Sequence, residues 1–351
     1  MKAILLAGGK GTRLRPLTLH TPKPIVPIFD RPFLQYQIDL LKQVPEIDEV
    51  ILSLNYQPRR LEETFGDGAG LGLRLRYVVE PSPLGTGGAI RYAAQGVDDT
   101  LVVFNGDVMT AVDVAAVVRR HREQKAVATI VLTPVDNPSA YGLVETTPEG
   151  AVKRFLEKPS ADEITCDTIN AGIYVLEPSS FDRIPKDTPY SIERGYFPSL
   201  VERGETFVAY VDRGYWIDIG TPEKYLGVHR DIFAGRCPLG PAGIAEGQPV
   251  VSPDAKIEPG AVLEGPCFVD AGAHVKAGAR LGPLSVIGRS VVVEEGAQVT
   301  GAIVWANSRI GRDAVVDGAL VGRGCHVGRD ARVGPTAILG DKSALTDFTQ
   351  V

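Results

Sequence analysis

The residues best suited to chemistry stand near the start of the chain, where a glycine-rich turn follows an apolar run. The turn is Leu6–Arg13, and three of its eight residues are glycines. Glycine lets a backbone turn sharply and bring its N–H groups against phosphate oxygens. Thr12 can donate one more hydrogen bond, and Arg13 and Lys23 add positive charge. The spacing matches neither the G-x-G-x-x-G fingerprint nor the G-x-x-x-x-G-K-[ST] loop. The turn predicts a triphosphate site; the alternative is a plain glycine turn with solvated basic side chains.

Two aspartates are candidates for a divalent-cation site. Asp107 comes shortly after the apolar run Leu101–Phe104, and Asp218 follows Trp216 in a second apolar context. Open α/β sheets bind ligands at the carboxyl ends of their strands. Mg2+ prefers oxygen ligands and usually takes one or two carboxylates together with substrate phosphates. We therefore expect Asp107 and Asp218 to hold Mg2+, whereas either aspartate alone would be interpreted as a cap or turn residue.

The elements that position these residues are predicted to form an α/β domain. Short apolar runs alternate with helical stretches from residue 1 to about 233, which is typical of a mostly parallel sheet covered by helices. The expected strands are Lys2–Leu6, Glu49–Leu54, Leu101–Phe104 and Thr129–Thr133, and the expected helices are Phe33–Lys42, Gly87–Ala94 and Ala111–Lys125. Leu34, Ile38 and Leu41 recur at helical spacing. We expect a Rossmann-like fold for this half.

From Val251 onward an aliphatic residue recurs every six positions, with two slips of one residue, as far as Leu339. A small residue stands two positions before nearly every one of them, and Cys267 and Cys325 occupy two of these small-residue places. Such hexapeptide repeats build a parallel β-helix, whose interior takes one aliphatic side chain per strand. About five coils are expected. The pattern resembles the left-handed hexapeptide β-helix. The predicted organisation is a first domain at 1–234, a linker rich in Gly and Pro at 235–249, and a β-helix domain at 250–351.

Composition and charge narrow the class of protein. The chain has 351 residues, too many for one ordinary core, and its 44% hydrophobic and 23% charged residues are the balance of a globular enzyme. The net charge is -6 and there is no long Lys/Arg run, so nothing in the sequence recruits nucleic acid or an anionic membrane. The four cysteines lack metal-ligand spacing. No apolar stretch reaches the length of a membrane span, so we expect a cytoplasmic protein.

The motifs together resemble the signature of the sugar-1-phosphate nucleotidyltransferases. The match begins with G-G-x-G-T-R-L-x-P-L-T and P-K-P at the start of the chain. It continues in order through the family's other motifs, which are Leu84–Ala89, Asn105–Asp107, Tyr141–Gly142, Glu157–Pro159, Asn170–Gly172 and Trp216–Pro222. The resemblance covers essentially the whole chain, and it implies transfer of a nucleoside monophosphate from a triphosphate to a sugar-1-phosphate with release of pyrophosphate.

The resemblance also implies a role for each motif residue. Nucleotide contacts are expected from Leu6, Ala7, Gly8, Gly9, Gly11, Thr12, Arg13, Glu80, Gly85, Thr86 and Asp107. Sugar-phosphate contacts are expected from Gly142, Glu157, Lys158 and Asn170. Arg13 and Lys23 are expected to hold the expelled pyrophosphate, and Lys158 the phosphate of the sugar, so these three are the expected catalytic residues. A phosphate monoester is itself a nucleophile, so catalysis reduces to positioning and charge neutralisation.

The choice of substrate depends on two observations. Glu80 stands where the family contacts the base, and a carboxylate can accept from guanine N1–H and N2–H together, whereas uracil or thymine would suit an amide better. The segment Ser191–Pro198 resembles that of mannose-1-phosphate guanylyltransferases. We expect GTP and mannose-1-phosphate as substrates. The alternatives are a thymidylyl- or uridylyltransferase acting on glucose-1-phosphate and a non-catalytic regulatory subunit that binds a sugar nucleotide.

A homo-oligomer is expected through the β-helix domain. Stacked coils leave open ends and strand faces that must be covered. Ile303, Val315 and Leu320 stand beside interior positions of the repeat and predict an exposed apolar flank, which usually marks an interface. The catalytic residues are all expected to come from the first domain.

Overall fold

The computed structural model describes residues 1–55 and 57–351 and divides into two compact units. The first unit comprises Met1–Lys10 and Leu34–Asp218. The second comprises Gly11–Phe33 and Ile219–Val351, so a segment from the glycine-rich start of the chain belongs to the same unit as the β-helix. Within the described residues no helix is long and apolar enough to cross a membrane.

A nine-stranded mixed sheet forms the centre of the first unit. Its main path is β10-β9-β11-β6-β1-β4-β5, and β8 pairs with β11 and with β12. The central β1 is parallel to both of its neighbours, β4 and β6. The strands are β1 (Lys2–Leu6), β4 (Glu49–Leu54), β5 (Arg74–Val79), β6 (Leu101–Asn105), β8 (Ala128–Pro134), β9 (Gly142–Thr146), β10 (Val152–Glu157), β11 (Thr168–Leu176) and β12 (Phe207–Val211). The four predicted strands and the Rossmann-like fold are confirmed, and the sheet is mixed, because β9, β10 and β11 pair antiparallel.

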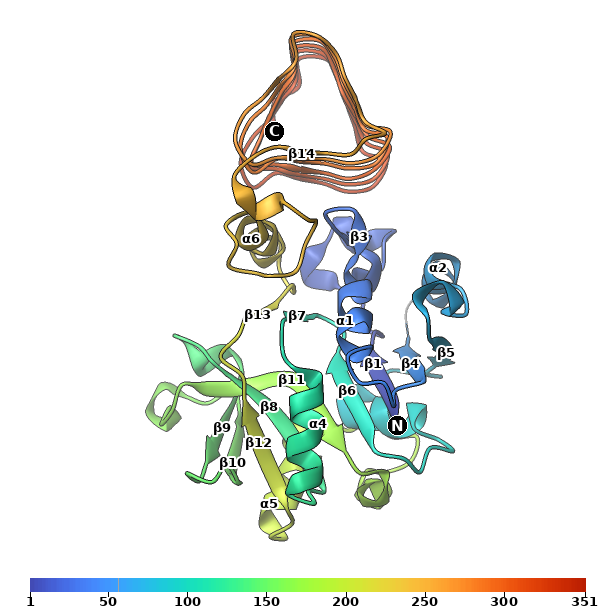
Figure 1. The fold of residues 1–351 in the computed structure, drawn as a ribbon, viewed down its shortest axis with the longest axis vertical. Helices are drawn as coiled ribbons and strands as arrows, with labels where there is room; N and C mark the ends of the chain where they lie inside the picture. Colours follow the sequence, from blue (N-terminus) through green and yellow to red (C-terminus); the bar gives the residue numbers. More distant parts are fainter. Residues whose placement is uncertain (56) are drawn as a thin grey trace. The chain divides into compact units, whose positions relative to one another are not determined.

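Helices cover the sheet, and a small separate ribbon stands beside it. The helices are α1 (Phe33–Leu41), α2 (Pro58–Phe65), α3 (Gly85–Ala93), α4 (Val114–Glu123) and α5 (Phe197–Glu202). α4 lies over β8 and β12 (Figure 1). It begins later than predicted, because Asp113 caps it by accepting a hydrogen bond from the Ala116 N–H at 2.8 Å. The ribbon pairs β7 (Val108–Thr110) with β13 (Trp216–Asp218).

The second unit begins with a short segment that contains the hairpin of β2 (Pro27–Ile28) and β3 (Arg31–Pro32). It continues with α6 (Pro222–Phe233), whose first turn is capped by the Thr221 hydroxyl. Cys237 and Ile244, in the stretch predicted to be a linker, are buried. Burial raises the pKa of Cys237 to about 11, which keeps this thiol protonated.

The repeat region is a parallel β-helix, seen end-on as a triangle in Figure 1. Three parallel sheets surround one apolar interior, which is the arrangement of the left-handed hexapeptide β-helix. The first contains β14 (Val250–Val251), β17 (Phe268–Val269), β20 (Val286–Ile287), β23 (Ile303–Val304), β26 (Leu320–Val321) and β29 (Ile338–Leu339). The second contains β15 (Lys256–Ile257), β18 (His274–Val275), β21 (Val292–Val293), β24 (Arg309–Ile310), β27 (His326–Val327) and β30 (Ala344–Leu345). The third contains β16 (Val262–Leu263), β19 (Arg280–Leu281), β22 (Gln298–Thr300), β25 (Val315–Asp317) and β28 (Arg332–Val333).

The interior follows the predicted six-residue pattern, with differences at its ends. Cys267 and Cys325 are packed in it as small residues, at 0% and 2% exposure. At the first coil Val251 is 36% exposed and lies outside the interior cluster. β30 adds a strand beyond Leu339, where the repeat was expected to end, so the second sheet has six strands, as the first does.

The predicted apolar flank of the β-helix is not exposed. Ile303 and Leu320 are 2% and 1% exposed, and Val315 is half-buried. Ile303 lines the same small cavity as Ile25 and Phe29, from the segment that joins this unit near the start of the chain. The prediction of an exposed apolar flank is wrong, because the protein covers part of this flank with its own residues. The flank therefore does not support an interface between chains.

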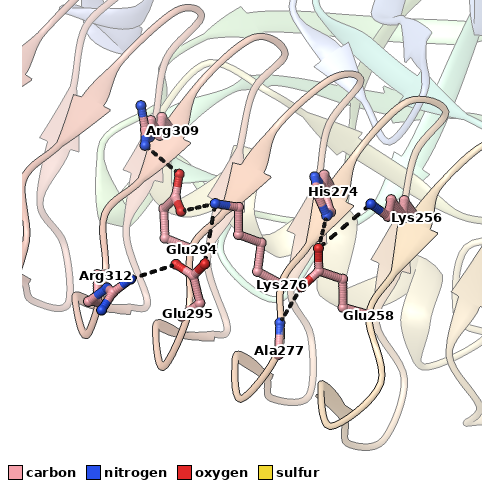
Figure 2. A network of polar contacts seen from close by, with 9 residues as sticks. All are labelled: Lys256, Glu258, His274, Lys276, Ala277, Glu294, Glu295, Arg309 and Arg312. Atoms are coloured by element: carbon pink, nitrogen blue, oxygen red, sulfur yellow. Dashed lines mark hydrogen bonds and ion pairs between the residues drawn. The ribbon is translucent and has the colours of Figure 1, made fainter.

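One outer face of the β-helix carries a network of charged side chains (Figure 2). Glu294, whose side chain is 6% exposed, accepts from Lys276 at 2.5 Å and pairs with Arg309 at 2.7 Å. His274, on the same coil as Lys276, pairs with Glu258 of the preceding coil at 2.6 Å. Each of these contacts joins neighbouring coils, so the network reinforces the backbone hydrogen bonds of the stack.

Candidate active site

The glycine-rich turn leaves the sheet where three strands end together. Leu6 pairs with Ser53 of β4 and Asn105 of β6. The Gly106 N–H donates to the Leu6 carbonyl at 3.0 Å, and a Cβ at Gly106 would clash with that oxygen. The end of β1 and the turn before Asp107 are therefore in backbone contact. The sequence predicts a ligand site at this edge, and the structure brings its backbone groups together there.

Gly8 and Glu80, two predicted nucleotide contacts, lie next to each other. A Cβ at Gly8 would stand 3.4 Å from Glu80 Oε1. The Glu80 side chain is buried, and its two oxygens accept hydrogen bonds from the Ser53 hydroxyl at 3.1 Å and the Leu84 N–H at 3.0 Å. Glu80 therefore also fixes the loop that leads into α3. Sequence reasoning considered only a base contact and missed this second role.

Two motifs that are far apart in the sequence pack against each other. They are Gly85–Thr86 and Ser191–Pro198. The Thr86 hydroxyl donates to Glu193 at 2.6 Å and accepts from the Ile192 N–H at 2.9 Å. Gly85 has φ +66°, and a Cβ there would lie 2.8 Å from the Tyr190 carbonyl oxygen. Residues Ile192–Tyr196 form a single π-helical turn, a conformation frequent at functional sites. Sequence reasoning did not place Glu193 among the site residues.

The short ribbon of β7 and β13 places Asp218 opposite the residue after Asp107. Asp218 pairs with Val108, the residue that follows Asp107. Asp218 is buried, and the Tyr141 hydroxyl donates to its Oδ2 at 3.0 Å. Aspartate carboxylates are oxygen donors that suit Mg2+, which takes its other ligands from substrate and water. Among the described residues no three acidic, histidine or cysteine side chains cluster as a larger metal site.

Gln37 braces this turn and was not predicted as a site residue. Its amide nitrogen donates to the carbonyl oxygens of Asn105 and Val108, both at 2.8 Å, on either side of Asp107. Gln37 is 1% exposed. A signal existed in the sequence, because Gln37 lies three residues after Leu34 and four before Leu41, on the apolar face of the predicted helix.

The predicted sugar contacts gather on neighbouring strands. Gly142 of β9 pairs with Glu157 of β10, and a Cβ at Gly142 would stand 3.0 Å from Glu157 Oε2. Asn170 of β11 follows Ile169, which pairs with Leu143, next to Gly142. The Asn170 amide donates to the Tyr174 hydroxyl at 2.9 Å.

Electrostatics distinguish Glu157 from the other carboxylates of this group. Burial and, to a smaller extent, the charge of Glu193 raise the pKa of Glu157, while Lys158 and Arg194 oppose the shift. Lys158 adopts φ +54°, a left-handed conformation that is uncommon for a residue with a side chain, and its N–H donates to the Tyr141 carbonyl at 3.1 Å. The site thus combines two close carboxylates with two basic residues.

Ala7 and Gly9 lie in the first unit, whereas Gly11, Thr12, Arg13 and Lys23 lie in the second. Gly11, with φ +60°, accepts a hydrogen bond from the Thr18 hydroxyl at 2.7 Å, and a Cβ there would stand 3.3 Å from the Lys23 Cβ. The Gly11 backbone and Lys23 are therefore neighbours. Lys23 is buried, whereas Thr12 and Arg13 are exposed.

The chain was compared with known families and proteins. The model of the nucleotidyl transferase family matches residues 2–235, and that of the GMPPB C-terminal domain matches residues 263–351. A mannose-1-phosphate guanylyltransferase of Mycobacterium tuberculosis is 42% identical, covering 85% of this chain and 82% of its own. A probable mannose-1-phosphate guanylyltransferase 1 of Oryza sativa is 36% identical over 99% of this chain and 93% of its own. A UTP–glucose-1-phosphate uridylyltransferase of Synechocystis is 31% identical over 92% and 88%.

A crystal structure of HddC from Yersinia pseudotuberculosis complexed with GMP-PN is similar to this chain with a TM-score of 0.56 and 29% identity, covering 66% of this chain and 99% of its own. The nucleotidyl transferase model spans well over half of the chain, and the curated relatives align along most of their own lengths. The chain therefore belongs to the nucleotidyl transferase family.

Proposed function

We propose that the protein is a mannose-1-phosphate guanylyltransferase, which transfers GMP from GTP to mannose-1-phosphate and releases pyrophosphate. The observation that carries the transferase chemistry is the pairing of Asp218 with Val108, which brings the backbone of Asp218 next to the residue that follows Asp107. The names of the relatives from Mycobacterium tuberculosis and Oryza sativa supply the substrates.

In this proposal the protein works by positioning and by neutralising charge. Asp107 and Asp218 would hold Mg2+, which when bound would offset the negative charge of the reacting phosphates. Arg13 and Lys23 hold the leaving pyrophosphate, and Lys158 holds the phosphate of the sugar. The sugar-phosphate oxygen attacks the α-phosphorus directly, so no activated serine, cysteine or histidine is required.

The other predicted residues bind the two substrates. Glu157, Asn170 and the backbone at Gly142 bind sugar hydroxyls. The backbone of Leu6, Ala7, Gly8, Gly9 and Gly11, together with Thr12, Gly85 and Thr86, binds the nucleotide. Glu80 accepts from the guanine edge with lone pairs beyond those already used by Ser53 and Leu84.

We further propose that the protein is cytoplasmic and forms a homo-oligomer through its β-helix. The apolar flank around Ile303 and Leu320 is covered and does not support self-association. The support comes from the last coil, where Phe348 is 62% exposed. Large exposed apolar side chains at the end of a repeat stack favour a contact with another chain.

The experiment that tests the function is a substrate panel. The protein is incubated with Mg2+, each common nucleoside triphosphate and a set of sugar-1-phosphates, and pyrophosphate release is measured. We expect the highest kcat/KM with GTP and mannose-1-phosphate. Preference for UTP or dTTP with glucose-1-phosphate would favour the alternative, which the Synechocystis relative supports. Binding of a sugar nucleotide without any pyrophosphate release would favour the regulatory alternative.

The metal assignment has its own test. Asp107→Asn and Asp218→Asn each remove a ligand charge while keeping the side-chain volume, so turnover should fall by at least about a hundredfold with the fold intact. Turnover is measured across a Mg2+ and a Mn2+ titration, with circular dichroism as the control for folding. Near-normal rates of both variants at saturating metal would contradict the assignment.

A further inference from the structure

The segment Gly11–Phe33, which carries Arg13 and Lys23, is attached to the last complete turn of the β-helix. The Thr21 hydroxyl donates to Asp341 Oδ2 at 2.7 Å, and Thr21 is 4% exposed. Pro16 lies against the neighbouring Gly340, where an added Cβ would stand 3.0 Å from the Pro16 Cβ. Residues more than three hundred positions apart are thus in direct contact within the second unit.

A second attachment holds the far end of the same segment. The Phe29 ring packs edge-on against Phe268 of the β-helix, with centroids 5.3 Å apart, and its N–H donates to His229 Nε2 at 3.3 Å. The Tyr225 hydroxyl donates to the Pro27 carbonyl and accepts from Trp305 Nε1 at 3.0 Å. His229 stays neutral, because burial lowers its pKa to about 4.

Asp341 connects the β-helix backbone to the residues around Lys23. Its Oδ1 accepts from the Arg323 N–H at 2.9 Å, which fixes the carboxylate to the neighbouring coil, while Oδ2 faces Thr21. Thr21 is two residues before Lys23, and Lys23 lies beside the Gly11 backbone that leads to Arg13. A shift of Thr21 would therefore move both basic residues.

We propose that Asp341, acting through Thr21, is a positioning residue for the phosphate-binding segment, so that the β-helix sets the placement of Lys23 and Arg13. This inference rests on the proposed function, since it uses the pyrophosphate role given to those two side chains. Reactions that depend on positioning are sensitive to displacements on the order of 1 Å, which can reduce the rate by about a hundredfold.

The test compares Thr21→Val, which removes only the hydroxyl, with Thr21→Ser, which keeps it. In Thr21→Val the Asp341–Arg323 hydrogen bond remains, so the coil itself is not altered. We expect kcat to fall about tenfold or more and KM for pyrophosphate in the reverse reaction to rise, with KM for the sugar-1-phosphate unchanged. Thr21→Ser should stay within about twofold of the wild type.

A second pair of variants approaches the contact from the other side. Asp341→Ala should reproduce the kinetic loss of Thr21→Val, whereas Asp341→Asn, which can still hydrogen-bond Thr21, should restore most of the rate. The double variant Thr21→Val/Asp341→Ala should be no worse than Asp341→Ala alone, because both changes remove one interaction.

The outcomes separate this inference from the proposed function. A wild-type protein without nucleotidyltransferase activity would refute the function, whereas an active wild type with an unaffected Thr21→Val would refute only the positioning role. A variant could also lose affinity for both sugar-1-phosphate and pyrophosphate while its melting temperature falls. This result would overturn the positioning role, because a general loss of stability affects both substrates, whereas misplaced Lys23 and Arg13 affect pyrophosphate alone.

Discussion

The carboxylate of Glu193 lies close enough to Glu157 for its charge to affect the ionisation of Glu157. Burial is the larger cause of the raised pKa of Glu157, and the charge of Glu193 adds to it. Glu193 is held in place by the hydroxyls of Thr86 and Ser191, both at 2.6 Å. In the proposed function the ionised form of Glu157 accepts hydrogen bonds from sugar hydroxyls. Its raised pKa means that this form is lost at a higher pH than for an ordinary glutamate.

The first prediction concerns Glu193→Gln, whose amide oxygen can keep both hydroxyl contacts while the charge is removed. Without that charge the pKa of Glu157 falls, so Glu157 stays ionised to lower pH. The acid limb of kcat/KM for the sugar-1-phosphate should therefore move to lower pH. Glu202→Gln, on an exposed helix end, is the control. The sugar phosphate ionises in the same way with the wild type and with both variants, so it does not account for a difference between them. A shift of the acid limb toward higher pH in Glu193→Gln would contradict the prediction.

Some residues of the candidate site can be predicted from sequence motifs, whereas others are identified only by the contacts that they make in the structure. Asp107, Asp218 and Glu157 stand in motifs that can be recognised in the sequence. Gln37 and Glu193 act by hydrogen bonds to residues distant in the chain, and a single polar side chain in a helix carries no information about its partner. Glu80 shows an intermediate case, since its position was predicted but its bond to the Leu84 N–H was not.

At the scale of elements, the close approach of β1 to the turn after β6 depends on Gly106. Any side chain there would meet the Leu6 carbonyl, which is backbone and cannot rotate away. Gly106→Ala should therefore destabilise the protein by about 1–3 kcal/mol and lower turnover by at least about a hundredfold, because Asp107 moves with the turn. Thermal unfolding and pyrophosphate release measure the two effects. Gly70→Ala, where an added Cβ meets nothing within 4 Å, is the matched control and should leave both unchanged.

Elements with a long periodic pattern were predictable, and the short ones were not. β1 and β4 match the predicted strands at both ends, because apolar runs bounded by turn residues mark a buried strand. β7 and β13 have only three residues each. Three residues give no measurable period, so the pairing that joins Asp218 to Val108 could not be predicted from the sequence. That pairing is the one on which the proposed metal site depends.

The charged face of the β-helix gives a prediction about stability (Figure 2). Glu294 is nearly buried between Lys276 and Arg309, so Glu294→Ala leaves two cations without their shared carboxylate. We expect the melting temperature to fall by about 2–4 °C. Glu264→Ala breaks the exposed pair with Arg280, at 3.2 Å, and should have no measurable effect. Equal effects of the two variants would show that burial of Glu294 contributes nothing.

At the scale of the whole molecule, the hexapeptide period predicted the β-helix but not what covers it. The repeat determines which side chains point inward, and the interior positions agree with it along most of the stack. Whether the outward Ile303 is free depends on a segment near the start of the chain, around Phe29, and the repeat contains no information about that segment. For the same reason the sequence assigned Arg13 and Lys23 to the first domain, whereas their segment packs with the β-helix.

The last prediction concerns self-association. Phe348, in the last coil, is 62% exposed, with Arg329 against its ring, while Val79 is 46% exposed at the edge strand β5 of the other unit. If the β-helix forms the interface, Phe348→Asp should convert the oligomer to monomers, because the apolar ring is lost and a carboxylate would have to be desolvated at the contact. Val79→Asp makes the same chemical change in the first unit and should leave the oligomer intact. Light scattering at several concentrations measures both. Dissociation by Val79→Asp alone would place the interface on the sheet edge, where an unpaired strand can join another chain.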